Sequence, residues 1–167
     1  MERAEKRSCI NRMKTEFRAI SENESLARSL SCAFISQLSP GVGELSDVRC
    51  AVSEAVTNAI VHGYANAGGA RNTVCLQIWL YSDRSVKIAV RDRGVGIPDV
   101  KAAMEPMYTT DTSGERSGMG FAIMSCFMDR LCVKSMPGKG TAVEMHKKFE
   151  PVAQPEGESE DAGQNAG

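Results

Sequence analysis

The stretch SEAVTNAIVHG, residues 53–63, lies in the most apolar helix that the sequence predicts, which runs from about residue 45 to residue 64. Apolar residues of this helix recur at intervals of three and four, which defines one buried face. They are Leu45, Val48, Val52, Ala55, Val56, Ala59 and Ile60. Glu54, Asn58 and His62 are spaced at four, so they stack in a polar stripe roughly opposite that face.

This spacing leaves two interpretations of the polar stripe open. It is either a solvated helix surface or one wall of a site that another element covers. The stripe lacks the Lys/Glu mixture of an ordinary exposed helix, which favours a site. Asn58 offers a neutral oxygen to a hard cation such as Mg²⁺, and Glu54 can accept a proton from an attacking hydroxyl.

The segments on either side of this helix predict an α+β fold. The expected strands are 14–20, 72–81, 85–90, 131–136 and 141–149, and the other expected helices are 21–37, 99–104 and 121–129. Ser21 and Glu24 predict a capping box at the start of the first helix. Residues 105–115 have little periodicity and predict a loop. The order is typical of a two-layer α/β sandwich, with helices on one face of a mostly antiparallel, mixed sheet.

Composition indicates one ordinary globular domain with charged ends. The 167 residues are 25% charged and 42% hydrophobic with a net charge of −1, which favours neither nucleic-acid nor anionic-membrane binding. The last 18 residues hold five acids and no base, and without them 20 basic residues face 16 acidic ones. We expect a frayed, charged N-terminal extension over 1–14, a domain over 15–149 and an acidic disordered tail over 150–167.

The cysteines and the hydropathy pattern bear on the cellular compartment. Six cysteines form no C-x-x-C pair, and His62 and His146 are the only histidines, so we expect no zinc site. No apolar run approaches the roughly 20 residues of a membrane span, and the N-terminus lacks the apolar core of a signal peptide. We therefore expect reduced thiols in a cytoplasmic protein without membrane contact.

The glycine pairs of the sequence are candidates for a phosphate-binding loop. Four Gly-x-Gly pairs occur, at 41/43, 94/96, 118/120 and 138/140, and none has a third glycine three residues later. This excludes the dinucleotide fingerprint, and the P-loop and eukaryotic-type kinase motifs are also absent. The 118/120 pair nevertheless runs into an apolar helix. Residues 117–121 can thus direct backbone N–H groups and a helix N-terminus at phosphates.

A second glycine-rich segment, RDRGVGI at residues 91–97, places Asp92 at the end of a strand, followed by Gly94 and Gly96. An Asp-x-Gly sequence is often only a turn. Alternatively, the Asp92 carboxylate faces a purine pocket and accepts a hydrogen bond from the exocyclic amine of adenine. Guanine presents an acceptor oxygen there, so a nucleotide site of this kind favours ATP over GTP.

Taken together, SEAVTNA, DRGVG from Asp92, RSGMGFAI from Arg116 and GKGT ending at Thr141 resemble the motifs of the GHKL ATPase superfamily. The resemblance covers roughly residues 15–149 and implies the Bergerat fold. Within the superfamily, SENESLAR, PMYTT and ERSGMGFAIMSCFMD are similar to the sporulation anti-sigma serine kinases.

This resemblance implies a role for each matching residue. Glu54 corresponds to the catalytic carboxylate, Asn58 to the Mg²⁺ ligand and Asp92 to the adenine-binding aspartate. The other residues expected to bind ATP or ADP are Gly94, Gly96, Ile97, Thr109, Thr110, Arg116, Ser117, Gly118, Met119, Gly120, Phe121 and Thr141. Arg116 is either the cation at the transferred phosphate or a solvated loop residue. By the resemblance, Arg28 corresponds to an arginine that faces a partner protein. Without the resemblance, it would be interpreted as a surface helix arginine with no specific role.

The implied function is that of a cytoplasmic homodimer with ATP, ADP and Mg²⁺ as ligands. It would inhibit the sporulation factor sigma-F by binding it and phosphorylate a serine of an anti-anti-sigma antagonist. The alternatives are a general-stress-type anti-sigma kinase, a module that binds nucleotide without kinase turnover, and a detached histidine-kinase ATP domain. The intact Glu54 argues against a module that only binds nucleotide. A detached histidine-kinase domain would need a phosphoacceptor histidine on a separate segment, and the sequence has no histidine outside the predicted domain.

Overall fold

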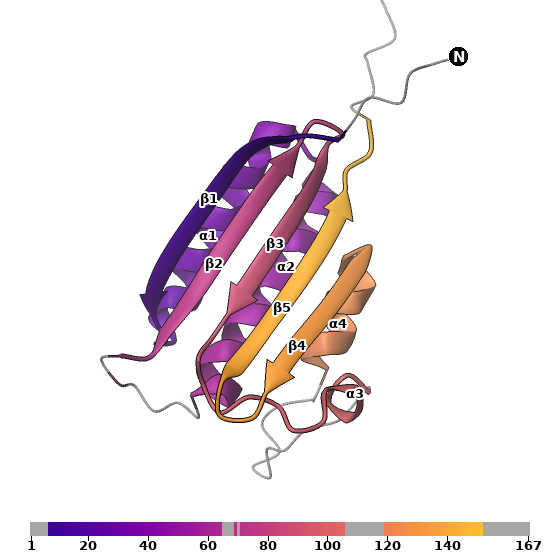
Figure 1. Ribbon diagram of the computed structural model, residues 1–167. Coiled ribbons are helices and arrows are strands. Elements are labelled where there is room, and N and C mark those ends of the chain that lie inside the picture. Colours follow the sequence, from indigo (N-terminus) through magenta and orange to yellow (C-terminus); the bar gives the residue numbers. More distant parts are fainter. Residues whose placement is uncertain (1–6, 65–68, 70, 106–118, 152–167) are drawn as a thin grey trace, which may run out of the picture.

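The computed structural model describes residues 7–64, 69, 71–105 and 119–151, which form a sheet backed by helices (Figure 1). The elements are β1 (Cys9–Arg18), α1 (Glu22–Ile35), η1 (Ser36–Leu38), α2 (Val42–Asn58), η2 (Ala59–Gly63), β2 (Thr73–Tyr81), β3 (Ser85–Arg91), α3 (Val100–Ala103), α4 (Gly120–Phe127), β4 (Arg130–Met136) and β5 (Gly140–Lys148). The strand order is β1-β2-β3-β5-β4. All four pairings in the described part of the chain are antiparallel.

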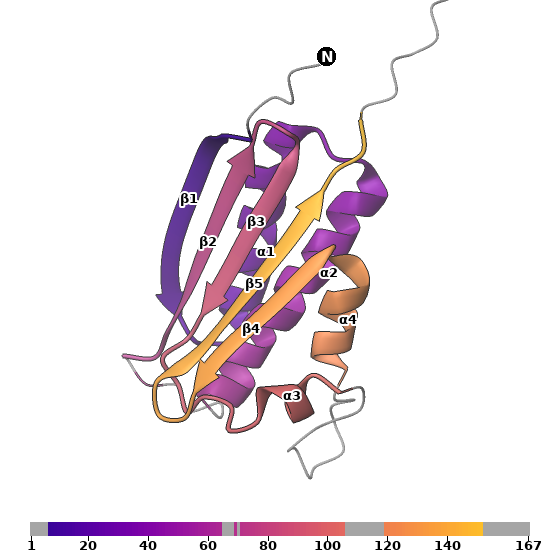
Figure 2. The ribbon, with the colours of Figure 1, turned by 45° about the vertical axis from the view of Figure 1, so that its right-hand side comes forward.

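The helices α1, α2 and α4 cover one face of this sheet, as the turned view shows (Figure 2). Strand β2 alternates, and its Val74, Leu76, Ile78 and Leu80 are fully buried. Val48, Val52 and Val56 of α2 are also fully buried and belong to the same core. This confirms the predicted two-layer α+β sandwich with a mostly antiparallel sheet.

Helix α2 lies at the centre of the helical layer and contacts both α1 and α4. Its predicted apolar face is buried from Val48 to Ile60, because removing these aliphatic side chains from water stabilises the fold. The helix begins at Val42, where the Gly41 N–H donates to Glu44 Oε2 over 2.8 Å. It continues past Asn58 as the wider π-helical turn η2. Such turns occur often at functional sites.

Two local predictions were wrong. Strand β1 begins at Cys9, so residues 9–14 pair with β2 from Tyr81 onward and do not belong to a frayed extension. The capping box at Ser21 is not formed, since Ser21 makes no side-chain cap hydrogen bond. The Glu24 carboxylate instead accepts a hydrogen bond of 2.6 Å from Ser53 Oγ of α2.

The predictions for both ends of the chain lie partly outside the described residues, namely at 1–6 and 152–167. Within the part that is described, no helix is long and apolar enough to cross a membrane. The six cysteines are all free thiols.

Candidate active site

The predicted polar stripe of α2 is covered by the start of α4. Glu54 and Asn58 are half-buried, whereas His62 is exposed. A Cβ atom added at Gly120, the first residue of α4, would lie 3.0 Å from Asn58 Nδ2 and 3.1 Å from Glu54 Oε2. The backbone of the α4 N-terminus therefore rests directly on these two side chains. This geometry supports a site and speaks against a solvated surface.

Glu54 has the surroundings of a proton acceptor. Burial is the main reason that its pKa is raised above the ordinary value, and the negative charge of Glu24 raises the pKa further. No described residue donates a hydrogen bond to the Glu54 carboxylate, so both oxygens can face a substrate hydroxyl. A carboxylate with a raised pKa is a better general base near neutral pH.

Asn58 lies one turn after Glu54 on the same stripe and supplies the neutral oxygen that suits Mg²⁺. Among the described residues no group of three or more His, Cys, Asp or Glu side chains could hold a metal ion by itself. A metal with one amide ligand needs phosphate oxygens and water as its other ligands, which is how Mg²⁺ is usually held beside a nucleotide. The residues present thus fit a Mg²⁺-nucleotide site.

Asp92 is held at the end of β3 with only 8% of its surface exposed. Its Oδ1 accepts hydrogen bonds from the backbone N–H groups of Gly94 over 2.8 Å and Thr141 over 3.3 Å. No hydrogen bond from a described residue reaches Oδ2. Burial raises the pKa of Asp92, and the two backbone donors partly oppose that rise. Asp92 therefore presents one fixed, unpaired oxygen, as an acceptor for an amine would.

Close backbone packing fixes the turn around Asp92. A Cβ atom at Gly94 would lie only 1.8 Å from the carbonyl oxygen of Gly63, and one at Gly63 would lie 2.9 Å from Asp92 Cγ. The Val95 N–H also donates to that carbonyl over 2.9 Å. Only glycine fits at Gly94, because any side chain would collide with backbone. The turn at Asp92 is thereby joined to η2, the continuation of the helix that carries Glu54 and Asn58.

Gly96 and Thr141 complete this part of the site. Gly96 has a φ of +73°, and a Cβ there would lie 2.2 Å from the Met136 carbonyl oxygen. The Ile97 N–H donates to Ser135 Oγ over 2.7 Å, and Ser135 Oγ lies 2.8 Å from Thr141 Oγ1. The predicted Gly94, Gly96, Ile97 and Thr141 are therefore brought together with Asp92 by a network across β4 and β5.

The remaining predicted residues divide into three groups. Thr109, Thr110, Arg116, Ser117 and Gly118 lie outside the described residues. Met119 precedes α4 and is 44% exposed, while Phe121 is half-buried against the core. Arg28 lies on α1, and its guanidinium is 3.8 Å from the Glu24 carboxylate.

Three residues of the site had no predicted role. Gly63 lies under Asp92, Ser135 links Ile97 to Thr141, and Tyr64 accepts a hydrogen bond of 2.8 Å from the Arg93 N–H through its hydroxyl oxygen. Gly63 ends a predicted helix, and a glycine there is ordinarily only a terminator. Its contact with Asp92 depends on tertiary packing and leaves no local signal.

Comparison with known proteins agrees with this geometry. A family profile described as a histidine kinase-like ATPase domain matches residues 17–147. The RsbU and RsbW domains of Rv1364c from Mycobacterium tuberculosis match with a TM-score of 0.58 at 18% identity, covering 83% of this chain and 32% of that chain. The catalytic domain of the histidine kinase ThkA matches with a TM-score of 0.50 at 17% identity, covering 82% and 96%. The fold and the site thus define a GHKL-type ATPase domain.

Sequence relatives narrow the class further. The chain is 52% identical over 139 residues to the anti-sigma F factor of Clostridium acetobutylicum, covering 83% of this chain and 94% of that protein. It is 49% identical over 141 residues to the anti-sigma F factor of Pasteuria penetrans, covering 84% and 92%. The chain belongs to the anti-sigma F factor family.

Proposed function

We propose that this anti-sigma factor binds sigma-F and, as an ATP-dependent protein serine kinase, phosphorylates a serine of an anti-anti-sigma antagonist. The observation that carries the kinase part is the close approach of Gly120 to Glu54 and Asn58, because it joins a helix N-terminus to a base and a metal ligand. The relatives are anti-sigma F factors, which supports sigma-F as the bound factor.

Three parts of the chain would hold the nucleotide. Asp92 Oδ2 would accept a hydrogen bond from the adenine amine, while Gly94 lets the turn after Asp92 pack against Gly63. The free N–H groups at the start of α4 bind phosphate oxygens. Asn58 would hold Mg²⁺ through its Oδ1, and the metal would supply positive charge to the phosphate oxygens.

Glu54 would act in the transfer step. It accepts the proton of the substrate serine hydroxyl while the serine oxygen bonds to the γ-phosphorus. The bond from that phosphorus to the β–γ bridging oxygen breaks, and ADP leaves with the electron pair. Phosphoryl transfer needs mainly positioning and charge neutralisation, so one base, one metal ligand and backbone amides are sufficient protein groups.

The remaining residues proposed to contact the nucleotide precede α4 in the sequence. Thr109, Thr110, Ser117 and Gly118 contact phosphate oxygens in this scheme. Arg116 is either the cation at the transferred phosphate or a neighbour that does not touch it, and an Arg116→Ala variant distinguishes the two by whether the transfer rate falls.

We propose a cytoplasmic homodimer as the working form, with residues 14–37 at its interface and Arg28 on the surface that meets a partner protein. Arg28 supports this role because nearly half of its side chain stays exposed despite the contact with Glu24.

The test is to incubate the purified protein with γ-labelled ATP, Mg²⁺ and a candidate antagonist. We expect label on a serine of the antagonist. Label on a histidine, or release of free phosphate alone, would contradict the kinase proposal, and binding of nucleotide without any transfer would favour the binding-module alternative. Co-purification with sigma-F tests the anti-sigma part separately.

A further inference from the structure

The face of the sheet opposite the helices carries an excess of positive charge. Side chains alternate along a strand, so those between the buried positions project from this open face. Its cations are Arg12, Lys14 and Arg18 of β1, Lys87 and Arg91 of β3, Arg130 and Lys134 of β4, and Lys148 of β5, while its strand carboxylates are Glu16 of β1 and Glu144 of β5. The open face is therefore cationic, although the whole chain has a net charge of −1.

Most of these cations have no acidic partner. Lys87 and Arg91 share Glu144, at 3.0 Å and 3.2 Å. For the other six, the described part of the chain offers no carboxylate within ion-pair distance. Like charges crowded on one surface repel each other, so this face favours an anionic partner.

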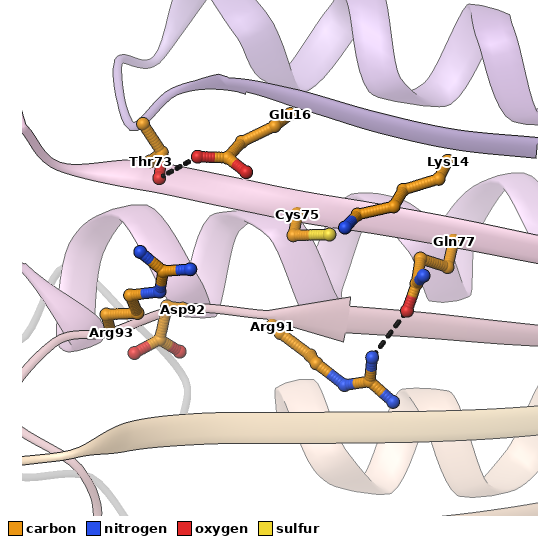
Figure 3. Close-up of a pocket in the computed structure, with 8 residues that line it drawn as sticks. All are labelled: Lys14, Glu16, Thr73, Cys75, Gln77, Arg91, Asp92 and Arg93. Carbon is orange, nitrogen blue, oxygen red and sulfur yellow. Dashed lines mark hydrogen bonds between the residues drawn. The ribbon is translucent and has the colours of Figure 1, made fainter.

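A hollow of about 240 Å³ lies on the open face (Figure 3). Lys14, Arg91 and Arg93 line it, with Cys75 between them. Glu16 also lines it, but its carboxylate accepts a hydrogen bond of 2.8 Å from Thr73. The Asp92 carboxylate points away from Lys14 in Figure 3, toward its backbone donors. The hollow thus holds three cations and two carboxylates on the face away from α2. Because Arg91 also pairs with Glu144, Lys14 and Arg93 are its cations without an ion pair among the described residues.

We propose that the acidic segment 156–161 of this same chain docks on the open face, with its carboxylates against Lys14, Arg91 and Arg93. The segment has the sequence EGESED and contains four acids, and residues 150–167 contain no base. The charges of the two surfaces are therefore complementary. This docking does not depend on the kinase proposal. It requires that the dimer proposed above uses α1 and the edge of β1 within residues 14–37, so that Lys14 on the open face stays uncovered.

The point where the tail leaves the sheet makes the docking geometrically feasible. Phe149 N–H donates to the Arg84 carbonyl oxygen over 3.1 Å, and the Arg84 guanidinium donates to the Glu150 carbonyl oxygen over 2.8 Å. These bonds fix the exit beside the β2–β3 turn. The eleven residues from 151 to 161 span up to about 38 Å when extended. Strand β2, with nine residues, is about 30 Å long.

Tethering favours the tail over an external anion. A tether of a few residues gives the acidic segment an effective concentration near the millimolar range, so weak ion pairs suffice to populate the docked state. Because exposed ion pairs are screened by salt, the docking should weaken as ionic strength rises.

Cross-linking with a water-soluble carbodiimide, which joins Lys amines to carboxylates, tests this proposal on the full chain. We expect cross-links from 156–161 to Lys14, Lys87 or Lys134 of the same molecule. We expect these links to be lost in 0.5 M salt, where the Debye length falls to about 4 Å. Lys139 in the β4–β5 turn and Lys101 on α3 are the matched controls, which should stay unlinked. Mixing ¹⁴N and ¹⁵N protein separates links within a chain from links between chains.

A second readout keeps the test independent of any one lysine. Removing residues 152–167, or replacing the four acids by amides, should increase the retention of the protein on a heparin column, because the open face is uncovered. The paired substitutions Arg12→Gln and Lys14→Gln should abolish that increase, whereas Lys139→Gln should preserve it. Cross-links only between chains, equal linking of Lys101 and Lys139, or unchanged heparin retention after truncation would each overturn the proposal.

Discussion

Glu54 and Asp92 are two acidic side chains withdrawn from water, and burial raises the pKa of each, yet their surroundings differ. Asp92 is fixed by two backbone N–H donors, and Gly63 and Gly94 pack closely against its turn. Glu54 receives no hydrogen bond from any described residue and lies under the start of a short helix. A fixed carboxylate suits recognition of a base, whereas an unpaired one suits proton transfer. The difference supports the separate roles that we propose for the two acids.

Replacing Glu54 by Gln gives the largest expected effect. The amide keeps the shape but cannot accept a proton, so serine phosphorylation should fall by roughly 10²–10⁴-fold. Nucleotide affinity should change little, since Glu54 acts only in the transfer step. Radiolabel transfer and calorimetric nucleotide binding measure the two quantities. An equal loss of phosphorylation rate and nucleotide affinity would contradict the separate roles of Glu54 and Asp92.

Asn58→Ala tests whether the stripe that carries Glu54 also holds the metal. We expect Mg-ATP affinity to fall on the order of 10-fold or more, because one oxygen ligand is lost. Affinity for ATP in EDTA should stay nearly constant. The same fall with and without metal would show that Asn58 supports the fold of the site and is not a ligand.

Gly120→Ala tests the cover over Glu54. The new Cβ would lie 3.0 Å from Asn58 and 3.1 Å from Glu54, so the start of α4 must shift by tenths of an ångström. Such misplacement should slow transfer by roughly 3- to 30-fold. Gly43→Ala is the matched control, because nothing lies within 4 Å of its Cβ. If both variants keep the wild-type transfer rate, the close packing at Gly120 does not affect phosphoryl transfer.

Glu24→Gln has the smallest expected effect, a shift in pH dependence. Transfer requires ionised Glu54, so the rate falls as pH drops through its raised pKa. The charge of Glu24 contributes to that rise, and removing it lowers the pKa of Glu54. The acid limb of the rate profile should therefore move to lower pH. Gln still accepts the Ser53 hydrogen bond, and Glu22→Gln, exposed in the first turn of α1, should leave the limb in place.

Much of this arrangement could be predicted from periodicity. The stripe of Glu54 and Asn58 and the buried face of α2 follow from spacing at three and four, and β2 follows from strict alternation. The turn at Asp92 was marked by its glycines. These features are local, so the sequence carries them directly.

Features that depend on tertiary contacts could not be predicted. The early start of β1 at Cys9 results from pairing with β2, which lies more than 60 residues away in the chain. The Ser21 capping box failed because Ser53 of another helix holds Glu24. Gly63 meets Asp92 only when η2 packs against the turn after β3. Local sequence patterns do not predict contacts with residues that are distant in the chain.

The separate roles of the two acids are tested most directly by nucleotide preference. Calorimetric titration would compare Mg-ATP with Mg-ITP, which carries an oxygen in place of the adenine amine. We expect the wild type and Glu54→Gln to prefer ATP on the order of 10²-fold, because ITP leaves a buried carboxylate facing an acceptor. Asp92→Asn should lose most of that preference. Preference retained in Asp92→Asn, or lost in Glu54→Gln, would contradict the assignment.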